Sequence, residues 1–154
     1  MFFLPFAFET EQYIDWLNTC IDYVEGNYAG AEVEFVDGGD TCILYESYDR
    51  LYDEDYMFNV TIQLNQKENH RKMLYALLHE AGHLERMIDH SGDATFFCGA
   101  NESKTHTVIE EVLAWSKAEE IAQRLDIYIE KRAWKHEMQN AINLYAKWHN
   151  KEDE

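Results

Sequence analysis

The predicted architecture depends on a change from strand to helix. It occurs between Tyr56-Met-Phe-Asn-Val-Thr-Ile-Gln-Leu64 and the residues that follow, from Asn65 to His90. The first segment alternates with period two, which is typical of a strand with one buried face: Phe58, Val60, Ile62 and Leu64. The second segment carries apolar residues at helical spacing, and Asn65 with Glu68 resembles a capping box at its start. We therefore expect a strand that leads directly into an amphipathic helix.

The residues before this stretch predict one helix and two further strands. Residues 10–25 carry apolar side chains at helical spacing. Residues 31–36 and 41–45 have strand patterns, and they flank Asp37-Gly-Gly-Asp40, which is a hairpin-turn signal. The polar residues 47–55 are expected to form a loop.

The residues after it are expected to form two more helices, at about 105–125 and 128–148. Trp134 begins an apolar stripe in the last helix, which predicts helix packing. The sequence thus predicts an α+β fold with an N-terminal helix, a three-stranded, mostly antiparallel sheet and then three helices. A length of 154 residues suits a single domain over 1–154.

Composition and charge limit the possible partners. The formal net charge of −17 argues against binding to nucleic acid or to an anionic membrane, because both would repel the chain. It is compatible with a cation or with a basic partner. Cys20, Cys42 and Cys98 are too few and too scattered for a disulfide framework, which favours a cytoplasmic protein with reduced thiols. We expect no signal peptide, because the apolar start carries no basic residues, and the sequence has no apolar run long enough to span a membrane.

His79-Glu-Ala-Gly-His83 lies within the predicted helix and has the H-E-x-x-H spacing. Residues four apart in a helix lie one turn apart on nearly the same face, so both imidazoles can bind one Zn²⁺ ion. Glu80 projects beside them, where it can act as the general base for zinc-activated water. Glycine in a helix interior costs about 1 kcal/mol relative to alanine, so Gly82 is expected to have a local reason. Close approach of another element to this helix would be one, and tight packing at Ala81-Gly82 is the other.

Two histidines leave zinc under-coordinated, so a third protein ligand is expected. We favour Glu111, because it heads a stripe of small and apolar residues, and a buried carboxylate needs a partner or a metal. The stripe continues through Ala114, Ala118, Ile121 and Leu125. Glu110 instead shares its face with Lys117 and Arg124, which indicates a solvated side chain, and it can form a capping box with Thr107.

Other ligands stay open: Asp89, Glu102, His106 and Glu110. Asp89 has the position of the third ligand in an extended zincin motif, but that arrangement needs a glycine where this chain has Arg86. Glu102 and His106 have no helical stripe behind them. The sequence also ranks no residue as the stabiliser of a reaction oxyanion; the candidates are His90, His106, Tyr45, Tyr48 and Tyr52.

His79-Glu-Ala-Gly-His83, followed by Glu111-Val-Leu-Ala114 on a later helix, resembles the minimal gluzincins, especially the ImmA/IrrE-type metallopeptidase domains. The resemblance implies a small zincin-like domain in which His79, His83 and Glu111 bind zinc and Glu80 is the catalytic base. It also implies that Phe58–Leu64, or a strand paired with it, holds a substrate peptide by strand addition.

We therefore predict a zinc-dependent peptidase that acts on proteins or peptides, with basic peptides as candidate substrates. Two other functions remain open. The protein could be a non-catalytic zinc-binding module, or an acidic protein that mimics nucleic acid and captures a basic partner.

Overall fold

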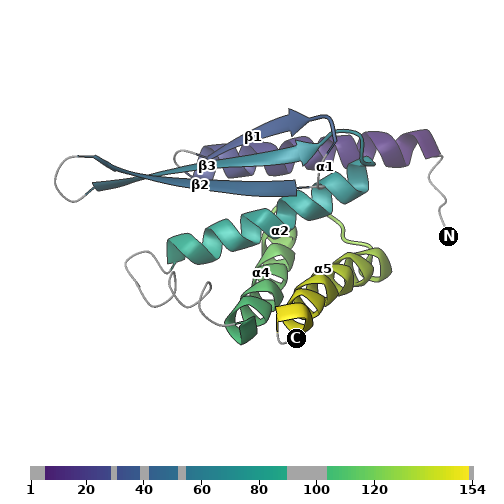
Figure 1. Ribbon diagram of the computed structural model, residues 1–154. Helices are drawn as coiled ribbons and strands as arrows, with labels where there is room; N and C mark the ends of the chain where they lie inside the picture. The colour runs from purple at the N-terminus through teal and green to yellow at the C-terminus, as the bar shows by residue number, and fades with distance from the viewer. Residues whose placement is uncertain (1–5, 29–30, 39–41, 52–54, 90–103, 153–154) are drawn as a thin grey trace. The chain divides into compact units, whose positions relative to one another are not determined.

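The computed structural model describes the main chain of residues 6–28, 31–38, 42–51, 55–89 and 104–152 (Figure 1). Within these ranges, the description excludes the side chains of residues 6–9, 42–51, 55–60, 87–89, 104–107 and 145–152. The chain divides into two compact units, Met1–Glu80 and Ala81–Glu154, and their boundary lies within helix α2 (His70–Asp89). Single-domain organisation stays a prediction. None of the described helices is both long and apolar enough to cross a membrane.

The N-terminal unit contains helix α1 (Phe6–Asn27) and the strands β1 (Ala31–Val36), β2 (Cys42–Leu51) and β3 (Asp55–Asn65). The strands form one sheet in the order β1-β3-β2, and α1 packs against β1 (Figure 1). The predicted N-terminal helix and all three predicted strands are therefore present.

The pairing within the sheet contradicts the prediction of a mostly antiparallel sheet. β1 pairs in parallel with β3, from Ala31 opposite Val60 to Val36 opposite Asn65, and β2 pairs antiparallel with β3. β1 and β2 are not neighbours, so Asp37-Gly-Gly-Asp40 does not close a hairpin between them. The predicted sheet is wrong, although the fold remains broadly α+β.

Contacts at the end of β1 explain this difference. Gly38 has a φ of 92°, and its N–H donates a hydrogen bond to Asn65 Oδ1 at 2.9 Å. The Gln66 N–H donates to the Val36 carbonyl oxygen at 2.8 Å. These bonds tie the end of β1 to the end of β3. A period-two pattern is the same in either strand orientation, so it did not reveal this choice of partner.

The central position of β3 in the sheet also contradicts part of the prediction that a substrate peptide is added as a strand beside Phe58–Leu64. From Val60 to Leu64, the main-chain groups of β3 form ladders with β1 on one side and β2 on the other, so this part of β3 cannot accept an added peptide strand. The predicted loop over 47–55 is wrong as well, because the antiparallel ladder extends to Leu51 opposite Asp55.

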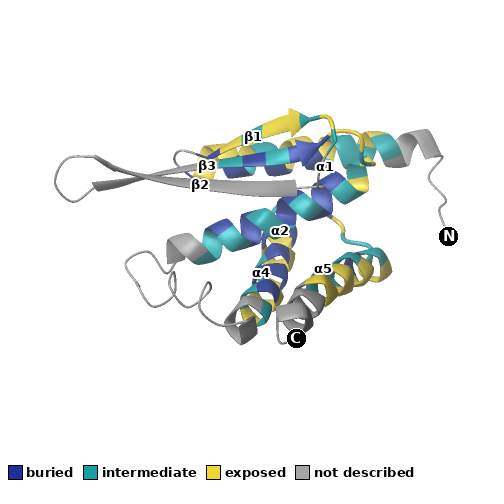
Figure 2. Cartoon of the chain, viewed as in Figure 1, coloured by how far each residue is buried: buried dark blue, intermediate teal, exposed yellow. Residues whose placement is uncertain are grey.

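Helix α2 begins later than the predicted capping box, because Asn65 is the last residue of β3 and its side chain binds backbone N–H groups of Gly38 and Lys67. The capping residue is Asn69, whose side-chain oxygen accepts a 2.9 Å hydrogen bond from the Lys72 N–H. Most buried side chains described in the N-terminal unit come from α1, β3 and the first half of α2 (Figure 2), and they include Leu17, Cys20, Val24, Ile62, Leu64, Leu74, Leu77 and Leu78.

The C-terminal unit contains the second half of α2 with the helices α4 (Lys104–Arg124) and α5 (Lys131–Glu152). Helix α4 packs against α5, and their contact includes an edge-to-face pair between Trp115 and Trp134 with ring centroids 4.9 Å apart. Trp134 is 3% exposed, which confirms its predicted packing role.

A Schellman motif ends α4, in which the Asp126 N–H bonds the Gln123 carbonyl oxygen and the Ile127 N–H bonds that of Ala122. Asp126 takes the left-handed position that usually holds glycine, with a φ of 55°.

Candidate metal centre

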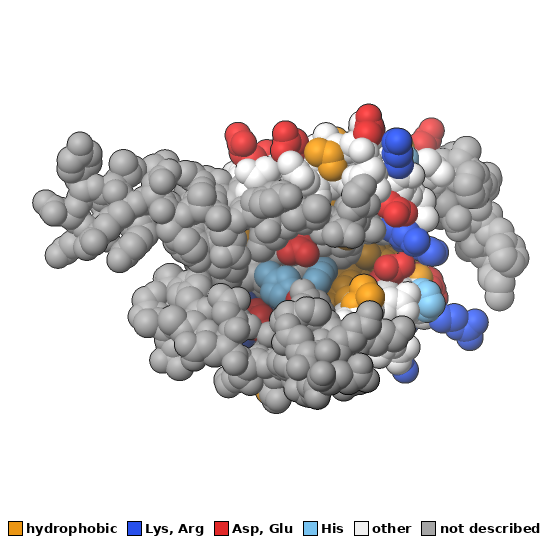
Figure 3. All heavy atoms as spheres, in the orientation of Figure 1, with side chains coloured by type: hydrophobic (Ala, Val, Ile, Leu, Met, Phe, Trp, Pro, Cys, Tyr) orange, Lys and Arg blue, Asp and Glu red, His pale blue; other side chains and the backbone are white. Residues whose placement is uncertain are grey.

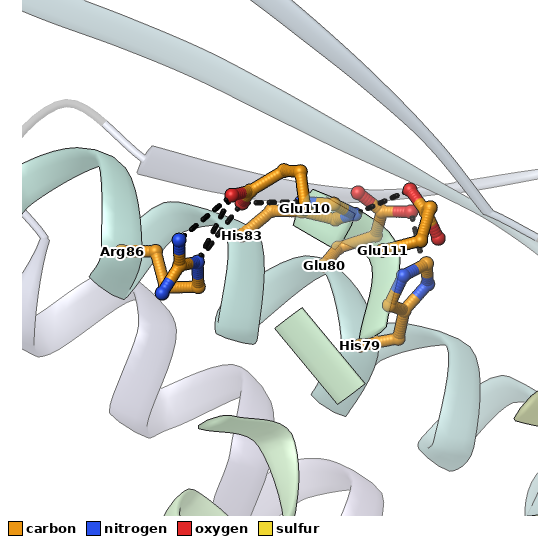
Figure 4. Close-up of polar contacts among 6 residues, drawn as sticks. All are labelled: His79, Glu80, His83, Arg86, Glu110 and Glu111. Atoms are coloured by element: carbon orange, nitrogen blue, oxygen red, sulfur yellow. Dashed lines mark hydrogen bonds and ion pairs between the residues drawn. The ribbon is translucent and has the colours of Figure 1, made fainter. Parts of the chain in front are cut away.

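Helix α2 carries both histidines of the H-E-x-x-H motif. His79 and His83 therefore lie one turn apart on nearly the same face of one helix (Figure 4). Their side chains are only 12% and 15% exposed. Glu80 lies beside them, with its Oε1 at 3.7 Å from His79 Nδ1 and a side chain that is 13% exposed.

Gly82 allows the second half of α2 to approach the backbone of α4. A Cβ atom added at this position would lie 3.1 Å from the Ala114 carbonyl carbon and 3.2 Å from the Ala118 nitrogen, and it would overlap the Ala114 carbonyl oxygen. Of the two reasons expected for Gly82, the close approach of another element is confirmed. This contact matters for the site, because Ala114 lies one turn after Glu111 on α4.

Glu111 is buried at 3% exposure, and Ala114, Ala118 and Ile121 of the stripe that it heads are buried as predicted, all at 0%, whereas Leu125 at its end is half-buried. Its Oε1 lies 2.9 Å from His83 Nε2 (Figure 4). One potential ligand atom from each of His79, His83 and Glu111 can be chosen so that all three lie within 4.8 Å of one another. The structure thus brings together the three residues that the sequence predicted as metal ligands.

The donor set of this cluster fits Zn²⁺. Two imidazole nitrogens and one carboxylate oxygen are a common ligand set of catalytic zinc sites, which keep a further position for water or substrate. Zinc bonds of about 2.0–2.1 Å in a tetrahedral site place ligand atoms about 3.3 Å apart, a separation of the same order as those within this cluster. A buried carboxylate such as Glu111 also gains from a nearby cation, because burial of an unpaired charge is costly.

Glu110 departs from its predicted solvated position. Its side chain is 16% exposed, and its Oε1 lies 3.4 Å from Nδ1 of His83, the ring nitrogen that does not face Glu111. Arg86 donates from Nε to both Glu110 oxygens, at 3.1 and 3.0 Å, and from Nη2 to Oε2 at 2.9 Å. Figure 4 shows these contacts as one series from Arg86 through Glu110 and His83 to Glu111.

The surroundings of Glu110 favour its ionised form. Burial raises the pKa of this carboxyl group, but the hydrogen bonds with His83 and Arg86 and the charge of Arg86 lower it by more. The net result is a pKa below the ordinary value for glutamate. Glu110 is therefore a carboxylate that neutral pH leaves charged, held between a cation and an imidazole.

Sequence reasoning missed the role of Arg86, which it considered only as a residue in place of a glycine. A signal was present, because Arg86 lies three residues after His83 and therefore on the same side of α2. The face of Glu110 was assigned from α4 alone, and the pairing cation belongs to a different helix.

Several candidates lie outside the described part of the chain. These are His90, Glu102 and Tyr52, together with the side chains of Asp89, His106, Tyr45 and Tyr48. Their roles as ligands or as oxyanion stabilisers stay predictions. No protein-family model, curated protein or solved structure matches this chain.

Proposed function

We propose that this protein is a zinc-dependent peptidase that hydrolyses proteins or peptides, as its resemblance to the ImmA/IrrE-type gluzincins implies. The observation that supports it most is the grouping of His79, His83 and Glu111 within 4.8 Å, with Glu80 next to His79. A surface ion pair or a solvated helix face would not require a carboxylate as buried as Glu111 beside an imidazole.

Each residue of the site has a distinct part in this proposal. His79, His83 and Glu111 hold the zinc ion, which when bound acts as a Lewis acid that lowers the pKa of water and polarises the peptide carbonyl. Glu80 is the general base: its carboxylate accepts a proton from the attacking water and then donates it to the leaving amine. The low exposure of Glu80 keeps that proton near the reacting groups and away from bulk solvent.

The charge of the chain favours basic substrates. A formal charge of −17 attracts cationic peptides and raises their rate of encounter with the site. Figure 3 shows acidic side chains gathered on the surface around β1, where Glu32, Glu34 and Asp37 are exposed. A cytoplasmic location, with the thiols reduced, belongs to the same proposal.

The test combines metal analysis with peptide cleavage. The parent protein should bind one Zn²⁺ ion per chain and cleave members of a fluorogenic peptide library, lysine- and arginine-rich ones best. Glu80→Gln should bind zinc as the parent does but cleave at least about 100-fold more slowly, because only the base is lost. Glu85→Gln, the same change on the same helix but in an ion pair with Arg124, should cleave like the parent.

Other outcomes would point to the other functions. Stoichiometric zinc without cleavage of any peptide would indicate a non-catalytic zinc-binding module. Capture of a basic DNA-binding protein by the parent and by His79→Ala alike, with no zinc in either, would indicate a nucleic-acid mimic. Equal cleavage rates for the parent and Glu80→Gln would refute the proposed role of Glu80.

A further inference from the structure

The two ring nitrogens of His83 face two different carboxylates on α4. Nε2 lies 2.9 Å from Glu111 Oε1, and Nδ1 lies 3.4 Å from Glu110 Oε1. Consecutive residues of one helix thus meet opposite edges of one imidazole. Nε2 faces the candidate metal site, so Nδ1 is the nitrogen left to interact with a supporting group.

Glu110 is itself held in place. The Arg86 guanidinium makes three hydrogen bonds of 2.9–3.1 Å to both of its oxygens, and each of the two side chains is about one-sixth exposed or less, at 15% and 16%. This bidentate geometry restricts the carboxylate to one orientation. The side chain that faces Nδ1 is therefore a rigid, charged acceptor.

We propose that Arg86 and Glu110 are positioning residues for the metal centre, an inference that rests on the proposed function. The Glu110 carboxylate accepts the Nδ1–H of His83, which keeps the proton on that nitrogen and leaves the Nε2 lone pair for zinc. Arg86 acts only through Glu110, by fixing the orientation of its carboxylate. His83 is thereby oriented for metal binding before the metal arrives.

Zinc affinity tests this role directly. Competition with a chromophoric chelator should show Zn²⁺ binding about 10- to 100-fold weaker in Glu110→Gln than in the parent, the usual effect of losing such a supporting partner. Glu111→Gln should weaken it considerably more, because a ligand is lost. Glu85→Gln should stay within about twofold of the parent, because Glu85 also joins α2 to α4, but through an ion pair with Arg124.

Two further measurements separate positioning from simple helix pairing. The absorption bands of the Co²⁺-loaded protein should change in Glu110→Gln but not in Glu85→Gln, since they report the arrangement of the ligands. Arg86→Gln should weaken zinc binding less than Glu110→Gln does. The double variant of Arg86 and Glu110 should bind zinc no more weakly than Glu110→Gln alone, because the arginine acts through the glutamate.

The outcomes distinguish this inference from the proposed function. If the parent and Glu110→Gln bind zinc equally well and give the same Co²⁺ spectrum, while Glu111→Gln loses zinc, the positioning role is refuted and the metal site stands. If the parent binds no zinc, both the proposed function and the positioning role are refuted. Additive effects of the Arg86 and Glu110 changes would refute the action of Arg86 through Glu110.

Discussion

Replacement of Gly82 by alanine should force α2 and α4 apart. The added Cβ would overlap the Ala114 carbonyl oxygen, which is backbone and cannot rotate away as a side chain can. A normal C···O separation of about 3.3 Å or more requires the two helices to separate locally by about 1 Å. The same movement carries Glu111, one turn before Ala114, away from His83.

Two opposing effects set the size of the stability change. Alanine is about 1 kcal/mol better than glycine in a helix interior. Overpacking of a tight contact costs about 1–3 kcal/mol, and a clash with rigid backbone belongs at the upper end of that range. We therefore expect Gly82→Ala to lower the free energy of unfolding by about 1–2 kcal/mol, which corresponds to a loss of about 2–8 °C in Tm.

The matched control is Gly26→Ala, the same substitution near the end of α1. A Cβ at Gly26 would meet nothing within 4 Å, so only the helix preference acts, and the protein should gain about 0.5–1 kcal/mol. Urea unfolding of both variants, followed by the fluorescence of the buried Trp115 and Trp134, gives the comparison. The two substitutions should thus change stability in opposite directions.

Zinc affinity provides a second measurement on Gly82→Ala. Metal sites tolerate ligand displacements of only about 0.2 Å, so a shift of about 1 Å should weaken Zn²⁺ binding at least about tenfold. Gly26→Ala should leave it unchanged. If Gly82→Ala were as stable as Gly26→Ala and bound zinc like the parent, the close contact between α2 and α4 would be refuted.

Two other predictions concern the end of α4 and the buried thiol. Asp126→Gly should stabilise the protein by about 0.5–1 kcal/mol in urea unfolding, because glycine accepts the φ of 55° without strain; a loss of stability would mean that the aspartate has another role there. Burial raises the pKa of the Cys20 thiol to about 12, so the unfolded chain loses this proton at lower pH than the folded one. This group should therefore lower the free energy of unfolding by about 1 kcal/mol per pH unit between pH 9 and pH 12, and its contribution should be absent in Cys20→Ala. Equal slopes of unfolding free energy against pH in both proteins would contradict the raised pKa.

The helices could be predicted because their signals are local. The stripe from Glu111 through Ala118 is visible in the printed sequence, and its members are buried in the structure. Gly82 is a similar case, since an unfavourable residue in a helix interior indicated a local reason, and that reason is the close approach of α4. The ligand roles of His79, His83 and Glu111 remain predictions, which measurements of zinc binding test.

The sheet and the ion pair could not be predicted in the same way, because each depends on residues distant in the sequence. The turn residues after β1 favour a hairpin locally, but hydrogen bonds with Asn65 and Gln66 at the end of β3 direct the chain elsewhere. Likewise, Glu110 looks solvated when α4 is considered alone. In the structure it is a half-buried carboxylate paired with Arg86 on α2.

The order of the sheet leaves β1 as an outer strand, and its composition affects how the protein behaves at high concentration. Outer strands offer unsatisfied main-chain groups that can join two molecules edge to edge. Glu32 and Glu34 project from β1 into solvent, so two copies that met along this strand would bring like charges together. The acidic character of β1 thus disfavours self-association along this strand.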